Sequence, residues 1–177
     1  MMIGHLSSLI LILLAVFGEQ SIDRHNPSEW KELNVEQGHF AILLPDNSDS
    51  PEYLDTFFKI TIHGKVTKLP AHEFGGSEGD VMYRVDYCDL AKGTTEDFLT
   101  FVRNNLKKDQ SITYRDISLG SYSGIEFERR SPEGSFSGRI YQVNSRVYSL
   151  MVSRPRNTTA PDNTARFLNS LKLIPPR

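Results

Sequence analysis

The sequence predicts an α+β fold in which an antiparallel sheet of about six to seven strands packs against two amphipathic helices. Segments with alternating apolar and polar residues follow one another along the chain, and short turn-like links join several of them. Two other segments have the apolar spacing of a helix, one in the middle of the chain and one near the C-terminus. Because short links join strands that run in opposite directions, this order favours an antiparallel sheet with helices packed on it.

Composition and charge narrow the functional class. The chain has 177 residues, of which 38% are hydrophobic and 24% charged, and these shares suit one globular domain, placed at residues 30–174. The formal net charge is −2, because the chain has 20 Lys and Arg residues and 22 Asp and Glu residues. Binding to nucleic acid needs a concentrated basic surface, so we expect no nucleic-acid partner.

Residues 1–18 are predicted to be a secretory signal peptide or a membrane anchor. The apolar run at residues 6–17 is shorter than the roughly 20 residues that span a bilayer, and Val16 and Gly18 suit signal cleavage. An uncleaved anchor remains the alternative because no Lys or Arg precedes the run. Residues 19–29 are polar and predicted to be a linker. We therefore expect an exported protein, periplasmic or extracellular, or one held at the membrane by residues 6–17.

The first half of the expected domain is predicted to begin with a short helix and continue as strands. Residues 28–33 (SEWKEL) favour a helix with Ser28 as its N-cap. Alternating apolar residues then predict strands at 40–44, 57–66 and 81–88. The stretch Pro70–Asp80 contains three glycines and is predicted to be a loop.

The second half is predicted as a helix, four strands and a second helix. Apolar residues recur at helical spacing within Thr94–Lys108, so one face of that helix should be buried. Strands are expected at 111–119, 124–130, 138–143 and 146–154, with Asn144-Ser145 as a two-residue hairpin turn. The closing helix is expected at about 161–171, because Pro161 suits a first helical turn.

The residues capable of chemistry form no complete catalytic motif. Glu126 and Glu128 lie two apart on one strand face, and we expect ion pairs there, with Arg84, Asp86, Arg130 and Arg139 as available cross-strand neighbours. Cys88, the single cysteine, is expected to be a small buried side chain rather than a nucleophile.

A metal site is considered around the predicted glycine loop. His63 and His72 would meet across that loop with Glu73 or Asp80, which are ligand types that zinc accepts. Two solvated loop histidines are the alternative, and we assign no metal ligand and no cofactor.

The order of several residues resembles a known family. The residues concerned are Trp30, Gly38-x-Phe40-x-Ile42-x-x-Pro45, Gly120-x-x-x-Gly124-x-Glu126-Phe127, Tyr141-x-x-x-x-Arg146-x-Tyr148-x-Leu150 and Phe167-x-x-Ser170. Over about residues 30–174 this pattern resembles the small exported bacterial domains with a PsbP-like fold. The resemblance implies a non-enzymatic domain that binds a partner protein or an ion, and it carries no site residues over.

We expect an exported, non-catalytic domain that binds a protein or a cell-envelope component through a loop-rich edge of its sheet. The candidate contact residues are His72, Glu73, Phe74 and Asp80, with Phe74 as an exposed aromatic anchor on the loop. In the alternative, Phe74 folds back over the sheet edge. The competing functional class is a metal-dependent or hydrolytic enzyme that uses the His63–Asp80 region.

Overall fold

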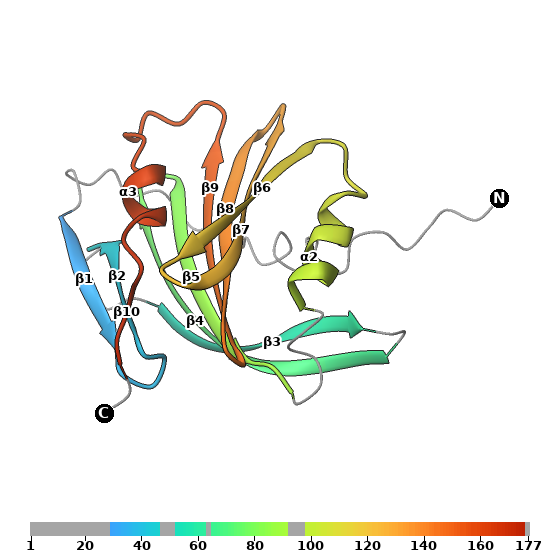
Figure 1. The fold of residues 1–177 in the computed structure, drawn as a ribbon. Coiled ribbons are helices and arrows are strands. Elements are labelled where there is room, and N and C mark those ends of the chain that lie inside the picture. Colours follow the sequence, from blue (N-terminus) through green and yellow to red (C-terminus); the bar gives the residue numbers. More distant parts are fainter. Residues whose placement is uncertain (1–28, 47–51, 63–64, 92–97, 176–177) are drawn as a thin grey trace.

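The computed structural model describes residues 29–46, 52–62, 65–91 and 98–175, which form two sheets and two short helices (Figure 1). The predicted signal peptide or anchor and all but the last residue of the predicted linker lie outside this described part. So do Ser28, His63 and the predicted first turn of the central helix. Within the described ranges, no helix has the length and apolar character needed to cross a membrane.

The elements alternate along the chain as a series of antiparallel hairpins with helices at two points. The strands are β1 (Trp30–Val35), β2 (Phe40–Pro45), β3 (Glu52–Ile62), β4 (Lys65–Glu78), β5 (Val81–Asp89), β6 (Ile112–Leu119), β7 (Tyr122–Ser131), β8 (Gly134–Val143), β9 (Arg146–Pro155) and β10 (Lys172–Leu173). The helices are α2 (Phe98–Leu106) and α3 (Thr164–Leu168).

The predicted α+β class with two packed amphipathic helices is wrong, because the described chain is mostly β. Strands assemble into a seven-stranded sheet of order β3-β4-β5-β9-β8-β7-β6 and a three-stranded sheet of order β1-β2-β10. The two helices in the described ranges contain only nine and five residues. The expected antiparallel pairing is confirmed in both sheets.

The large sheet has a different covering on each face. Its first face carries the small sheet and α3, while α2 lies over the second face (Figure 1). The core under the small sheet includes Phe40, Ile42, Tyr83, Leu150 and Phe167, all almost completely buried. The core under α2 includes Phe98, Leu99, Val102 and Leu106 together with apolar residues of the large sheet.

Polar contacts, including the two that follow, join the small sheet and α3 to the large sheet. The buried Tyr148 hydroxyl donates a hydrogen bond of 2.7 Å to the carbonyl of Gly38, in the turn between β1 and β2. The Arg139 guanidinium donates to the Leu168 carbonyl at 2.8 Å, where α3 ends, and so satisfies a carbonyl that the helix itself leaves free.

Residues 30–33 belong to β1, so the predicted helix at 28–33 is wrong for its described part. Glu, Lys and Leu favour a helix when only local preference counts. Trp30–Val35 instead pairs antiparallel with Pro45–Phe40, and Val35 is buried in the core shared with the large sheet. The closing helix is likewise shorter than predicted, since β10 begins four residues after α3 and pairs with β2.

The predicted loop at Pro70–Asp80 is also wrong, because residues 70–78 continue β4. This strand pairs with β3 on one side and with β5 on the other, which gives its backbone ladder partners. Its glycines follow from close packing: a Cβ at Gly76 would lie 3.0 Å from the carbonyl oxygen of Pro45 at the end of β2. A glycine inside a strand marks such an approach of another backbone segment.

Candidate functional site

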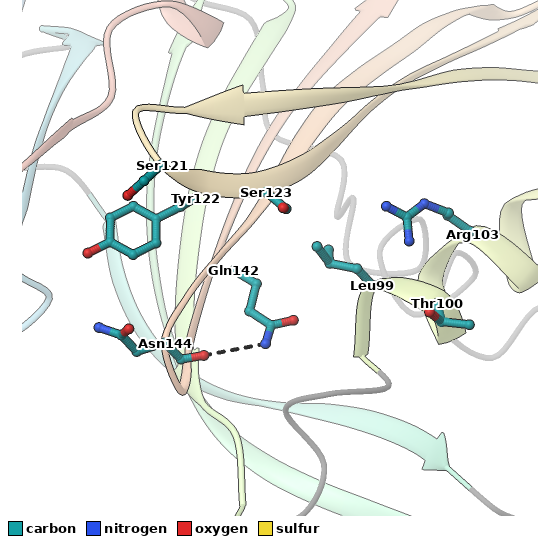
Figure 2. A pocket seen from close by; sticks show the side chains of 8 residues that line it. All are labelled: Leu99, Thr100, Arg103, Ser121, Tyr122, Ser123, Gln142 and Asn144. Atoms are coloured by element: carbon teal, nitrogen blue, oxygen red, sulfur yellow. Dashed lines mark hydrogen bonds between the residues drawn. The ribbon is translucent and has the colours of Figure 1, made fainter.

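A hollow of about 440 Å³ lies between α2 and one end of the large sheet (Figure 2). Its lining residues are Leu99, Thr100, Arg103, Ser121, Tyr122, Ser123, Gln142 and Asn144. Three separate segments of the chain supply them: α2, the β6–β7 turn with the start of β7, and the end of β8 with the following turn. We call this hollow the α2 pocket.

The hairpin arrangement explains why these segments meet. Strand β7 lies between β6 and β8, so the turn that starts β7 and the turn that ends β8 fall at the same end of the sheet. Asn144 has a φ of 56°, a left-handed conformation that asparagine tolerates better than most residues. The apolar face of α2 buries Leu99 against the sheet, which places the next residue, Thr100, at the rim of the hollow.

The α2 pocket is polar and its charge is balanced. Five lining side chains carry an uncharged aliphatic hydroxyl or an amide: Thr100, Ser121, Ser123, Gln142 and Asn144. Tyr122 adds a phenolic hydroxyl. The cation Arg103 donates from Nε to the Asp116 carboxylate at 2.8 Å. Gln142 donates from Nε2 to the Asn144 carbonyl at 3.4 Å, as Figure 2 shows. The pocket lining therefore offers several uncharged hydrogen-bonding groups and one arginine, Arg103, whose charge Asp116 balances.

The four residues predicted as contacts do not converge on one site. His72 and Phe74 lie on the face of β4 toward the small sheet, where the His72 ring stacks on Tyr87 at 4.7 Å between centroids. Phe74 is partly buried against Phe40 and Tyr87. Strand alternation directs Glu73 to the opposite face.

Asp80 lies apart from the other three, in the turn between β4 and β5. Its carboxylate accepts a hydrogen bond from the Thr158 hydroxyl, so it joins this turn to the segment after β9. Within the described ranges, no group of three His, Cys, Asp or Glu residues is arranged to hold a metal ion.

Glu73 belongs to an ionic cluster around one buried carboxylate, and no pattern in the sequence predicts it. Its carboxylate lies 3.6 Å from Arg84, and Arg84 lies 3.4 Å from the fully buried Asp86. Burial is the main cause that raises the pKa of Asp86 from its ordinary value to about 7. The Arg84 charge lowers this pKa, whereas the neighbouring Glu73 carboxylate raises it further. The register places Glu73 directly opposite Asp86, so strand pairing builds the cluster.

Ion pairs form around Glu126 and Glu128 of β7 as expected, but of the neighbours expected across the strands only Arg139 is correct. Arg130 lies on the same strand as Glu128. Arg84 and Asp86 lie on β5, where Arg84 contacts Glu73 and Asp86 instead. Glu126 binds Arg139 at 2.7 Å and Arg115 at 2.6 Å, and Glu128 binds Arg130 at 2.7 Å. The two arginines lower the pKa of Glu126 and outweigh the opposing effect of its partial burial. Cys88 is buried as expected, and burial raises the pKa of its thiol to about 12.

No family model and no curated protein matches this chain. The resemblance to PsbP-like domains therefore stays a prediction.

The α2 pocket was missed because its residues lack any chemical motif. Serine, threonine and amide residues near turns are common in all sequences. The usable signal was positional: Gly120 and Asn144 mark two hairpin turns separated by two strands, and turns related in this way lie at the same end of an antiparallel sheet.

Proposed function

We propose that this protein is an exported, non-catalytic binding domain that holds an uncharged, hydroxyl-rich component of the cell envelope, such as a sugar unit of a glycan, in the α2 pocket. The observation that carries the proposal is the pocket lining, in which five side chains with an uncharged aliphatic hydroxyl or amide, from three chain segments, line one open hollow. Export rests on the apolar N-terminal sequence.

The chemistry of the wall favours this ligand class over a charged one. Hydroxyl and amide groups both donate and accept hydrogen bonds, so they match the mixed donors and acceptors of sugar hydroxyls. Arg103 is already paired with Asp116, so an anionic ligand would have to compete with that carboxylate. Tyr122 and Leu99 add the apolar surface that small-molecule sites combine with a few polar groups.

Binding to purified envelope glycans and their soluble oligosaccharide fragments tests the proposal. We expect the protein to sediment with the glycan, and the Gln142→Leu variant to bind a soluble fragment roughly three- to tenfold more weakly in calorimetry, the loss expected for one neutral hydrogen bond. Gln110→Leu is the matched control, because Gln110 is an exposed amide outside the pocket.

Three outcomes would overturn the proposal. These are no binding to any envelope glycan, an equal loss in the Gln110→Leu and Gln142→Leu variants, and a release of glycan fragments that depends on the protein. Protein-dependent fragment release that His72→Ala abolishes would support the competing enzyme class in the His63–Asp80 region.

A further inference from the structure

Arg103 gives the α2 pocket a preference about charge. It alone is charged among the residues that line the pocket, and its side chain extends from α2 toward Ser123, as Figure 2 shows. Asp116, which accepts a hydrogen bond from Nε of Arg103, does not line the pocket, and its side chain is 67% exposed. A ligand in the hollow therefore faces the guanidinium, whereas solvent screens the carboxylate.

The guanidinium of Arg103 favours a neutral acceptor over a cation. Asp116 accepts from Nε, and a guanidinium has further N–H donors on its two terminal nitrogens. A neutral carbonyl oxygen of a ligand can accept from those nitrogens without displacing the Asp116 carboxylate. An ammonium group brings only donors and a like charge, so the guanidinium repels it.

The neighbouring side chains suit an amide that carries a methyl group. Gln142 and Asn144 bring two amides to the pocket lining, and Leu99 brings an apolar side chain. Figure 2 shows the Gln142 amide between the other two. A side-chain amide donates to the carbonyl of a second amide and accepts from its N–H, and an apolar side chain suits a methyl group. An acetamido substituent combines a carbonyl, an N–H and a methyl group.

We propose that the α2 pocket recognises N-acetylated amino sugars and discriminates against both their free-amine and their plain hydroxyl forms. This inference rests on the proposed function and narrows its ligand class to sugars that carry an acetamido group. A different effect acts on each competitor. Repulsion by Arg103 excludes the protonated amine, and the hydroxyl form leaves polar groups of the pocket without the amide that they pair with.

Three oligosaccharides that share one backbone test the preference. The tetramers of chitin, fully deacetylated chitosan and cellulose differ only in an acetamido, an ammonium or a hydroxyl group on each sugar. In calorimetry at low salt and pH about 6, where the amine is protonated, the chitin tetramer should bind most tightly. We expect the cellulose tetramer to bind roughly three- to tenfold more weakly and the chitosan tetramer about tenfold or more weakly. Added salt should reduce only the deficit of the chitosan tetramer, because salt screens the repulsion.

Charge variants test the role of Arg103. Arg103→Gln should narrow the ratio of the chitin and chitosan affinities by about threefold or more, because the repelling charge is lost. Asp116→Asn should widen this ratio, because the guanidinium then lacks its balancing carboxylate. Arg115→Gln is the matched control, since Arg115 lies on the same strand as Asp116, is 70% exposed and does not line the pocket. Its ratio should equal that of the unmodified protein.

The outcomes separate this inference from the proposed function. A chitosan or cellulose tetramer that binds as tightly as the chitin tetramer would overturn the N-acetyl preference, and so would the absence of binding to all three. An unchanged ratio in Arg103→Gln, or the same change in Arg115→Gln, would also overturn it. In each case, binding to envelope glycans would leave the proposed function standing. Only failure of the envelope glycans themselves removes both.

Discussion

A single buried carboxyl group should make the stability of this protein depend on pH. The pKa of Asp86 is about 7 in the folded protein and close to its ordinary value of 3.8 in the unfolded chain. Between these values the folded state keeps a proton that the unfolded state has lost, so stability falls as the pH rises through about 7. Each pH unit between about 5 and about 7 lowers the free energy of unfolding by about 1.36 kcal/mol, and above about 7 the effect levels off. We therefore expect a total loss of roughly 2–3 kcal/mol between pH about 5 and about 8. Urea titrations at the two pH values measure it.

Asp86→Asn should remove most of this dependence, because an amide does not titrate. Asp116→Asn is the control: its carboxylate is 67% exposed, so the variant should keep the pH dependence of the unmodified protein. If Asp86→Asn loses as much stability as the unmodified protein between the two pH values, the dependence comes from other groups.

At the scale of one element, the contribution of α2 to the free energy of unfolding should come from its buried face. Leu106 is 3% exposed and belongs to the core under the helix, so Leu106→Ala should lower the free energy of unfolding by roughly 2–5 kcal/mol. Thr100 lies on the exposed side of the same helix, and Thr100→Ala should change it by less than about 0.5 kcal/mol. Urea titration of both variants measures the difference, and similar losses would show that the two faces of α2 are assigned wrongly.

At the scale of the whole molecule, the two sheets should unfold together. The apolar side chains of the small sheet have no core of their own but share one with the large sheet. Phe74 lies at this boundary, with ring centroids 6.2 Å from Phe40 and 6.4 Å from Tyr87. Because it is only partly buried, Phe74→Ala should cost about 2 kcal/mol, less than the usual loss for a fully buried Phe, and should leave a single cooperative transition.

Circular dichroism during thermal unfolding, together with tryptophan fluorescence from Trp30 in β1, measures that cooperativity. Met82→Ala is the control, since Met82 is 44% exposed and should contribute little. Separate transitions by the two probes would show that the small sheet unfolds independently. Unchanged stability with weaker capture of envelope material would instead support the role of Phe74 as a partner anchor.

Local sequence patterns predicted the secondary structure correctly wherever residues close together in the chain decide the conformation. Alternation predicted the strand at 81–88, helical spacing predicted the buried face of α2, and Asn144-Ser145 predicted its hairpin, because each depends on residues within a few positions of one another. The signal failed at β1 and at residues 70–78. There, helix-favouring residues and glycines form strands because partner strands distant in sequence satisfy their backbone hydrogen bonds and a neighbouring backbone packs against Gly76.

The same distinction separates the predicted site residues from the α2 pocket. Residue chemistry selected His72, Glu73, Phe74 and Asp80 as contact residues. Strand alternation places His72 and Phe74 on one face of β4 and Glu73 on the other, and Asp80 lies in the turn after this strand. The pocket and the Glu73–Arg84–Asp86 cluster exist because strand register and helix packing bring together residues that are far apart in sequence. Spacing along the chain determines which residues share a strand face. Only the pairing of whole strands determines what that face meets.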